Sequence, residues 1–207
     1  MNVDRPLDDL WLDTASLLSL GNMRNARRAL DAGALRQRLR WCETVEDELR
    51  HLQMKRRPPP GAREAMGMRS HLGAVQAPSE AQEDQIRRIH RQLATGSEPD
   101  KHWGEIETAV LAVDSHTDLA DQHPDREIVV LAASEDNDMP VALGIAQQTA
   151  AVRYWTTVDL LMYLVASGHL TCEQAWDDYQ YAISEGDRPL QQVTKKQLCA
   201  GSPDPTS

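Results

Sequence analysis

The amino-acid sequence predicts an α/β fold, a three-layer α/β/α sandwich with a mostly parallel sheet. The apolar runs 10-LWL-12 and 127-EIVVLAA-133 are typical of short strands, and segments with helical spacing separate the predicted strands. The second run is apolar from Ile128 to Ala133, which favours a strand buried on both faces. Alternation of strands and helices favours a parallel sheet covered by helices.

Asp13 marks the end of the first predicted strand. An aspartate at such a junction either caps the helix that follows or belongs to a site. In a parallel sheet, ligands bind outside the carboxyl ends of the strands, where the strand order switches. The acidic loop 134-SEDND-138 follows another predicted strand, so we expect it to lie near Asp13 and to favour a site.

The other elements follow from periodicity and from capping residues. Thr44 with Asp47 and Thr171 with Gln174 have capping-box spacing. The predicted helices cover 14–33 with a break at Gly21-Asn22, 45–54, 81–94, 104–116, 141–150, 158–168 and 171–186, and the further strands cover 39–42 and 151–157.

We expect one domain over residues 1–190, interrupted by an insertion at about 54–103. Three consecutive prolines at 58–60 stop any helix, so the first part of the insertion should be a long loop or a loosely attached helical segment. Residues 191–207 form a C-terminal tail whose last part has the composition of a disordered segment.

Composition restricts the protein's surroundings and partners. The sequence has no apolar run of the roughly 20 residues that would span a bilayer, and its N-terminus lacks the pattern of a signal peptide. Cys42, Cys172 and Cys199 are widely spaced and form no CxxC pair, which argues against a disulfide framework. These features predict a cytoplasmic protein without a membrane partner.

The charge is strongly negative overall but uneven along the chain. The formal net charge is −10, so a general attraction to nucleic acid is not expected. Residues 50–101 carry a net charge of +4, however, which leaves −14 for the rest. This basic strip is either a solvated surface or a surface for a phosphate backbone, and Lys55, Arg56 and Arg57 are candidates for binding substrate.

Carboxylates from distant parts of the sequence are the candidate catalytic and metal-binding residues. They are Asp13, Glu48, Glu105 and Asp138, with Asp136 as the alternative fourth acid. Gathered together, such groups repel one another unless a cation lies between them. Oxygen ligands of this kind suit Mg²⁺ or Mn²⁺, which can activate water for attack on a phosphodiester.

The ordered set of segments resembles the PIN domain family. The resemblance covers most of the chain from Leu10 to Asp187, apart from the insertion. The segments that carry it are 10-LWLDTASLLSL-20, 47-DEL-49, 104-GEIETAVLA-112, 129-VVLAASEDNDMPVALGIA-146 and 156-TTVDLLMYLVASGHLTCEQA-175.

This resemblance implies a metal-dependent endoribonuclease, and in many bacterial members a toxin held by an antitoxin. It maps the family's acidic quartet to Asp13, Glu48, Glu105 and Asp138, and it suggests Thr14 and Ser134 as further site residues. RNA would be the substrate, and an antitoxin protein and a second copy of the chain would be possible partners.

The fourth motif departs from the family pattern, because SEDND spreads three acids over five residues. A PIN-fold binding or assembly module without catalysis is therefore an alternative hypothesis. A structure-specific DNA nuclease with the same site is another. In the third motif, Glu105 and Glu107 lie two positions apart on a helix and must point to different sides, and we favour Glu105.

Overall fold

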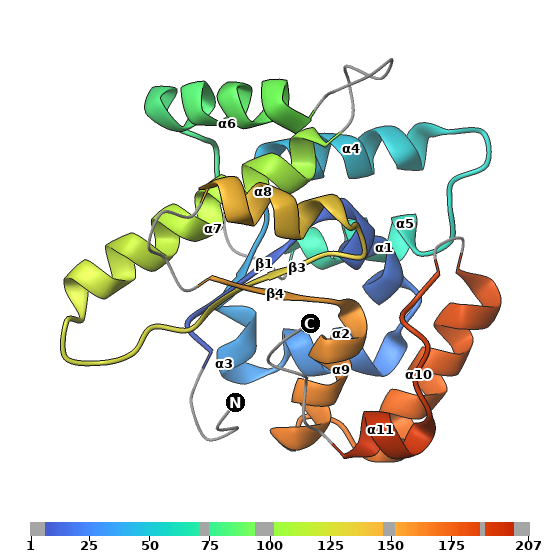
Figure 1. Ribbon diagram of the computed structural model, residues 1–207. Coiled ribbons are helices and arrows are strands. Elements are labelled where there is room, and N and C mark those ends of the chain that lie inside the picture. Colours follow the sequence, from blue (N-terminus) through green and yellow to red (C-terminus); the bar gives the residue numbers. More distant parts are fainter. Residues whose placement is uncertain (1–6, 71–74, 94–101, 147–151, 187–188, 201–207) are drawn as a thin grey trace.

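A four-stranded sheet runs through the centre of the molecule (Figure 1). The computed structural model describes residues 7–70, 75–93, 102–146, 152–186 and 189–200. Each neighbouring pair of strands is parallel, in the order β2-β1-β3-β4. The strands are β1 (Asp9–Leu12), β2 (Leu39–Arg40), β3 (Val130–Ala133) and β4 (Arg153–Trp155).

The strand order places a topological switch beside β1. From β1 the chain passes to β2 on one side, whereas β3 and β4 lie on the other. Leu12 at the end of β1 pairs with Ala133 at the end of β3, so both strands finish at the same level. Residues that follow these two strands therefore emerge side by side at the crevice where α/β proteins bind ligands.

Helices cover both faces of this sheet. In Figure 1, α4, α6, α7 and α8 lie on one side, and α2, α3, α9, α10 and α11 lie on the other. The predicted α/β class with a parallel sheet is thus confirmed. The bounds are α1 (Thr14–Gly21), α2 (Arg24–Asp31), α3 (Gly33–Arg36), α4 (Glu43–Met54), α5 (Ala62–Gly67), the 3₁₀ turn η1 (Met68–Ser70), α6 (Glu80–Leu93), α7 (Trp103–Gln122), α8 (Asp138–Ala146), α9 (Thr157–Ala166), α10 (Cys172–Glu185) and α11 (Lys195–Cys199).

The insertion predicted at about 54–103 begins with a non-helical stretch over residues 55–61, and the helix α5 that follows is well packed and not loosely attached. In α5, Ala62 and Ala65 are fully buried. Gly61 precedes α5 in a left-handed conformation with φ +80°. A Cβ added to Gly21 of α1 would lie 2.1 Å from the carbonyl oxygen of Gly61. Small residues thus let α1 and α5 approach each other closely, and α5 belongs to the main body of the fold.

Several predicted element boundaries are confirmed. The helical stretch after Asp13 does break near Gly21. The capping box of Thr171 and Gln174 is present at the start of α10, and Thr156 forms another with Asp159 at α9. The predicted positions 147–150 and 201–207 lie outside the described residues.

The prediction that Thr44 caps a helix is wrong. α4 begins at Glu43, and its N-cap residue Cys42 makes no capping hydrogen bond with its side chain. The hydroxyl of Thr44 donates instead to the carboxylate of Glu107 in α7. Glu107 also accepts a hydrogen bond from the backbone nitrogen of Glu43 at 3.1 Å. A carboxylate distant in the sequence therefore pairs with a backbone N–H group that has no acceptor within α4.

The argument against a disulfide also needs correction. Cys172 at the start of α10 and Cys199 at the end of α11 form a disulfide, with their Cα atoms 5.1 Å apart. This bond ties α11 to α10. Cys42 is a free, fully buried thiol. Among the described residues, no helix combines the length and apolar character needed to cross a bilayer.

Candidate functional site

Asp13 lies at the crevice between the ends of β1 and β3. Its side chain is fully buried, and its backbone nitrogen donates to the carbonyl of Ala133 at 3.2 Å. One carboxylate oxygen accepts a hydrogen bond from the backbone nitrogen of Ser16 at 2.7 Å, which caps α1. The other accepts from the hydroxyl of Ser134. Asp13 therefore caps α1 and also lies beside the loop that follows β3.

Ser134 links Asp13 to the acidic loop. Its side chain is fully buried, and its hydroxyl oxygen accepts a hydrogen bond from the backbone nitrogen of Asp136 at 2.8 Å. The Asp136 carboxylate in turn accepts from the backbone nitrogen of Asp138 at 3.1 Å. This side-chain bond starts α8 at Asp138, three residues earlier than the sequence predicted.

Glu48 reaches the same region from α4. Its carboxylate accepts a hydrogen bond from the hydroxyl of Thr14, the residue after Asp13. It also lies against α7, since a Cβ on Gly104 would lie 3.1 Å from both carboxylate oxygens. The absence of a side chain at Gly104 therefore lets Glu48 approach the residue beside Glu105.

Glu105 is the carboxylate of this region whose pKa departs most clearly from its ordinary value. Burial raises the pKa of its side chain from 4.5 to about 7, with further contributions from the negative charges of Asp13, Glu48 and Asp136. Glu107 points elsewhere, towards the start of α4. We define the acidic cluster as Asp13, Glu48, Glu105 and Asp136.

The two candidates for the fourth acid have different surroundings. Asp136 is one of the charges that raise the pKa of Glu105. The carboxylate of Asp138 lies 3.2 Å from Nδ1 of His102 and is 42% exposed. His102 has a left-handed backbone with φ +73° at the start of α7. This geometry favours Asp136 as the member of the cluster and places Asp138 at its edge.

Tyr154 and Glu135 support the loop that follows β3. The Tyr154 hydroxyl donates to the carbonyl of Ser134 at 3.1 Å. The pKa of Tyr154 is raised to about 12, mainly by burial and further by the negative charges of Glu135 and Asp13. Glu135 accepts a hydrogen bond from the backbone nitrogen of Thr157 at 2.6 Å, so its carboxylate serves the start of α9. A tyrosine in a predicted strand gives no signal of this role.

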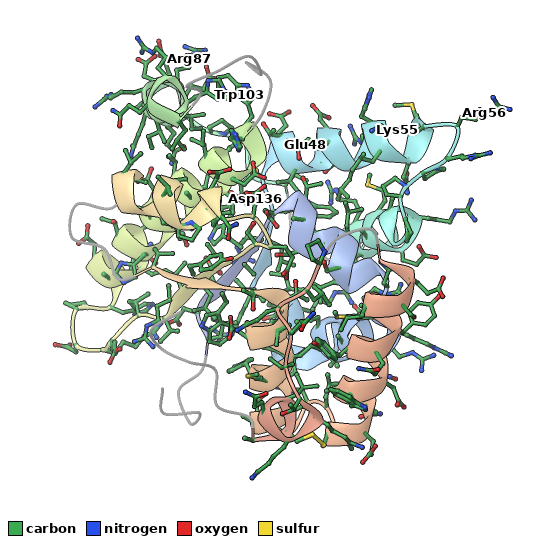
Figure 2. The ribbon with its side chains drawn as sticks, turned by 45° about the vertical axis from the view of Figure 1, so that its right-hand side comes forward. Glu48, Lys55, Arg56, Arg87, Trp103 and Asp136 are labelled. Carbon is green, nitrogen blue, oxygen red and sulfur yellow. A yellow bond between two sulfur atoms is a disulfide. The ribbon has the colours of Figure 1, made fainter. Side chains whose placement is uncertain are left out.

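The predicted substrate-binding residues fall into two groups. Thr14 and Ser134 are buried, and their hydroxyls orient carboxylates of the cluster. Lys55, Arg56 and Arg57 are exposed beyond the end of α4. Figure 2 shows Lys55 and Arg56 extending from the far end of this helix, while Glu48 and Asp136 lie in the central part of the molecule.

The acidic cluster fits a hard divalent ion in its chemistry. Its donors are all carboxylate oxygens, which suit Mg²⁺ or Mn²⁺. Burial is the main cause of the raised pKa of Glu105, and the negative charges of Asp13, Glu48 and Asp136, which a cation would neutralise, add to it. As the described residues stand, however, no three His, Cys, Asp or Glu side chains are placed so that together they could hold an ion. Binding would therefore require the carboxylates to reorient.

Comparisons with family models, with curated proteins and with solved structures find no match to this chain. The functional argument consequently depends on the residues and their geometry.

Proposed function

We propose that this protein is a metal-dependent endoribonuclease of PIN type, with the acidic cluster as its active site. The observation that carries the proposal is the meeting of carboxylates from four separate segments at the topological switch of a parallel sheet. Asp13 follows β1, Glu48 belongs to α4, Glu105 to α7, and Asp136 follows β3. The ordered resemblance of the sequence to PIN domains supports the same function.

A bound Mg²⁺ or Mn²⁺ would neutralise the cluster and supply an activated water for attack on the phosphodiester. The chain's own residues would orient the ligand oxygens. Ser134 and the backbone of Ser16 fix the carboxylate of Asp13, and Thr14 fixes that of Glu48. These hydrogen bonds hold the two carboxylates beside each other at the crevice, and a modest reorientation of both would bring their oxygens onto one ion.

RNA is the proposed substrate, and Lys55, Arg56 and Arg57 are proposed to contact its backbone. Lys55 follows the last residue of α4 and lies seven positions after Glu48, which corresponds to roughly 10 Å along a helix. A strand of RNA bound at the cluster would reach the basic group within a few nucleotides. A role as a toxin, with an antitoxin as partner, and homodimer formation belong to this same proposal.

A cleavage assay with matched variants tests the proposal. Glu48→Gln removes one charge of the cluster, and Asp47→Asn removes a charge from an exposed neighbour that pairs with Arg50 at 3.7 Å. With Mn²⁺ present, the unmodified protein and Asp47→Asn should cleave single-stranded RNA, and Glu48→Gln should not. Equal cleavage by both variants would contradict the assignment. Preferential cleavage of flapped DNA would instead support the DNA nuclease alternative.

A binding or assembly module without catalysis is the second candidate. It is favoured by the hydrogen bonds that already engage both oxygens of Asp13, together with the lack of a ready ion site among the described residues. Under this hypothesis the carboxylates stabilise the loop after β3. The protein would then bind Mn²⁺ weakly or not at all, whereas the nuclease requires the ion.

A further inference from the structure

Three arginines of α2 line a cavity that is separate from the acidic cluster. Arg24, Arg27 and Arg28 have the spacing i, i+3 and i+4, so they share one side of the helix. The cavity has a volume of about 390 Å³, which falls within the range of small-molecule pockets. Its wall includes Leu39 of β2 and Met68 after α5, and no residue of the acidic cluster lines it.

The acidic residues around these guanidinium groups form no close ion pair with them among the described residues. In the described part of the chain, none of the three takes part in an ion pair within 4.0 Å. The Nε of Arg27 is buried and has no hydrogen-bond acceptor. Like charges at this spacing destabilise a helix, and an unsatisfied buried donor costs further free energy.

The acidic groups near the arginines are largely committed to other partners. Asp31 lines the cavity and lies 3.9 Å from Arg36. Asp178 lies near Arg27, but it accepts hydrogen bonds from the backbone nitrogens of Asn25 at 3.2 Å and Ala26 at 2.6 Å. Glu64 of α5 is exposed and also lines the cavity. The lining side chains therefore carry a net charge of +1 in a protein whose total is −10.

We propose that this cavity binds a phosphate group through Arg27 and Arg28, with Arg24 at its rim. Arginine is the side chain best suited to this task, because its planar guanidinium donates paired hydrogen bonds to phosphate oxygens. Asp178 holds the start of α2 in place, so the arginines are presented from a fixed helix.

Calorimetric titration with inorganic phosphate and with adenosine monophosphate at low salt tests the proposal. Arg27→Gln should weaken binding at least about tenfold, since hydrogen bonds to charged groups contribute on that scale. Arg28→Gln, at an exposed position, should also weaken binding without a risk to folding. Glu64→Gln should strengthen it several-fold, because it removes a repelling charge. Arg88→Gln on α6 is the control and should have no effect.

The site is independent of the proposed nuclease activity, so Asp13→Asn should bind phosphate as well as the unmodified protein does. In that variant, competition by an oligoribonucleotide with a 5′-phosphate but not by one with a 5′-hydroxyl would identify an RNA end as the source. Competition by neither oligonucleotide would identify small phosphate compounds as the source, and equal competition by both would identify the phosphodiesters of the RNA backbone. Absence of saturable phosphate binding, or unchanged binding in both Arg27→Gln and Arg28→Gln, would overturn the proposal.

Discussion

The hydroxyl of Ser134 donates a hydrogen bond to the carboxylate of Asp13 across the junction between β1 and β3. The two residues are 121 positions apart in the sequence, yet both directly follow the ends of paired strands. The same hydroxyl accepts from the backbone of Asp136. One buried side chain therefore fixes both the first acid and the loop that supplies the fourth.

Ser134→Ala should destabilise the fold by about 1 to 3 kcal/mol, because it removes the hydroxyl that donates to the buried Asp13 carboxylate and accepts from the backbone nitrogen of Asp136. Ser16→Ala is the matched control. Ser16 is equally buried, but its hydroxyl has no hydrogen-bond partner, so its removal should be nearly neutral. Urea denaturation of both variants measures the difference. Equal destabilisation would show that the hydrogen bonds of Ser134 contribute little.

Glu105→Gln should change the pH dependence of stability. The folded protein holds the Glu105 proton up to about pH 7, whereas the unfolded chain releases it near 4.5. Stability contributed by this group is therefore present at low pH and is lost as the pH rises from 4.5 to about 7. At pH 8 the Gln variant should be more stable, by on the order of 3 kcal/mol, and near pH 4.5 the difference should be small.

Glu107→Gln provides the contrast on the same helix. Glu107 accepts hydrogen bonds from Thr44 and from the backbone of Glu43, so its neutralisation should lower stability across this pH range. Thermal unfolding at a series of pH values distinguishes the two variants. A Glu105→Gln protein that is no more stable than the unmodified one at pH 8 would contradict the raised pKa.

Gly104→Ala should disturb the cluster without unfolding the protein. The added Cβ would lie 3.1 Å from both oxygens of Glu48, so the carboxylate must shift. Cleavage and Mn²⁺ binding should fall, whereas helix propensity favours alanine by about 1 kcal/mol. Gly144→Ala in α8 is the control, since its Cβ meets nothing within 4 Å. It should stabilise the protein and leave cleavage unchanged, and equal cleavage by both variants would argue against a role for Glu48.

Much of the fold could be predicted from the sequence. The apolar runs and their alternation with helical segments predict the parallel sheet, and a parallel sheet brings the residues that follow its strands to one edge. The proximity of Asp13 to the loop at Ser134 follows from that rule. Helical periodicity also predicts that Glu105 and Glu107 point apart, although the direction of each depends on how α7 packs on the rest of the fold.

The errors arose where a distant contact overrides a local pattern. Thr44 has the spacing of a helix cap, but Glu107, 63 positions away, takes its hydroxyl. The sequence does not show which of the three acids in the SEDND loop lies in the cluster. That depends on the start of α8, which is set by the hydrogen bond from the backbone nitrogen of Asp138 to the carboxylate of Asp136. The disulfide between Cys172 and Cys199 joins residues separated by 27 positions and depends on the docking of a five-residue helix.

Binding of Mn²⁺, followed by calorimetry at pH 8, tests the central claim most directly. Asp13→Asn keeps a cap for α1 but removes the charge at the centre of the cluster. The unmodified protein and Asp47→Asn should bind Mn²⁺ with the same affinity, and Asp13→Asn should lose that binding while retaining its thermal transition. If the unmodified protein binds no Mn²⁺, or if Asp13→Asn binds it equally well, the acidic cluster is not a metal site and the nuclease proposal fails.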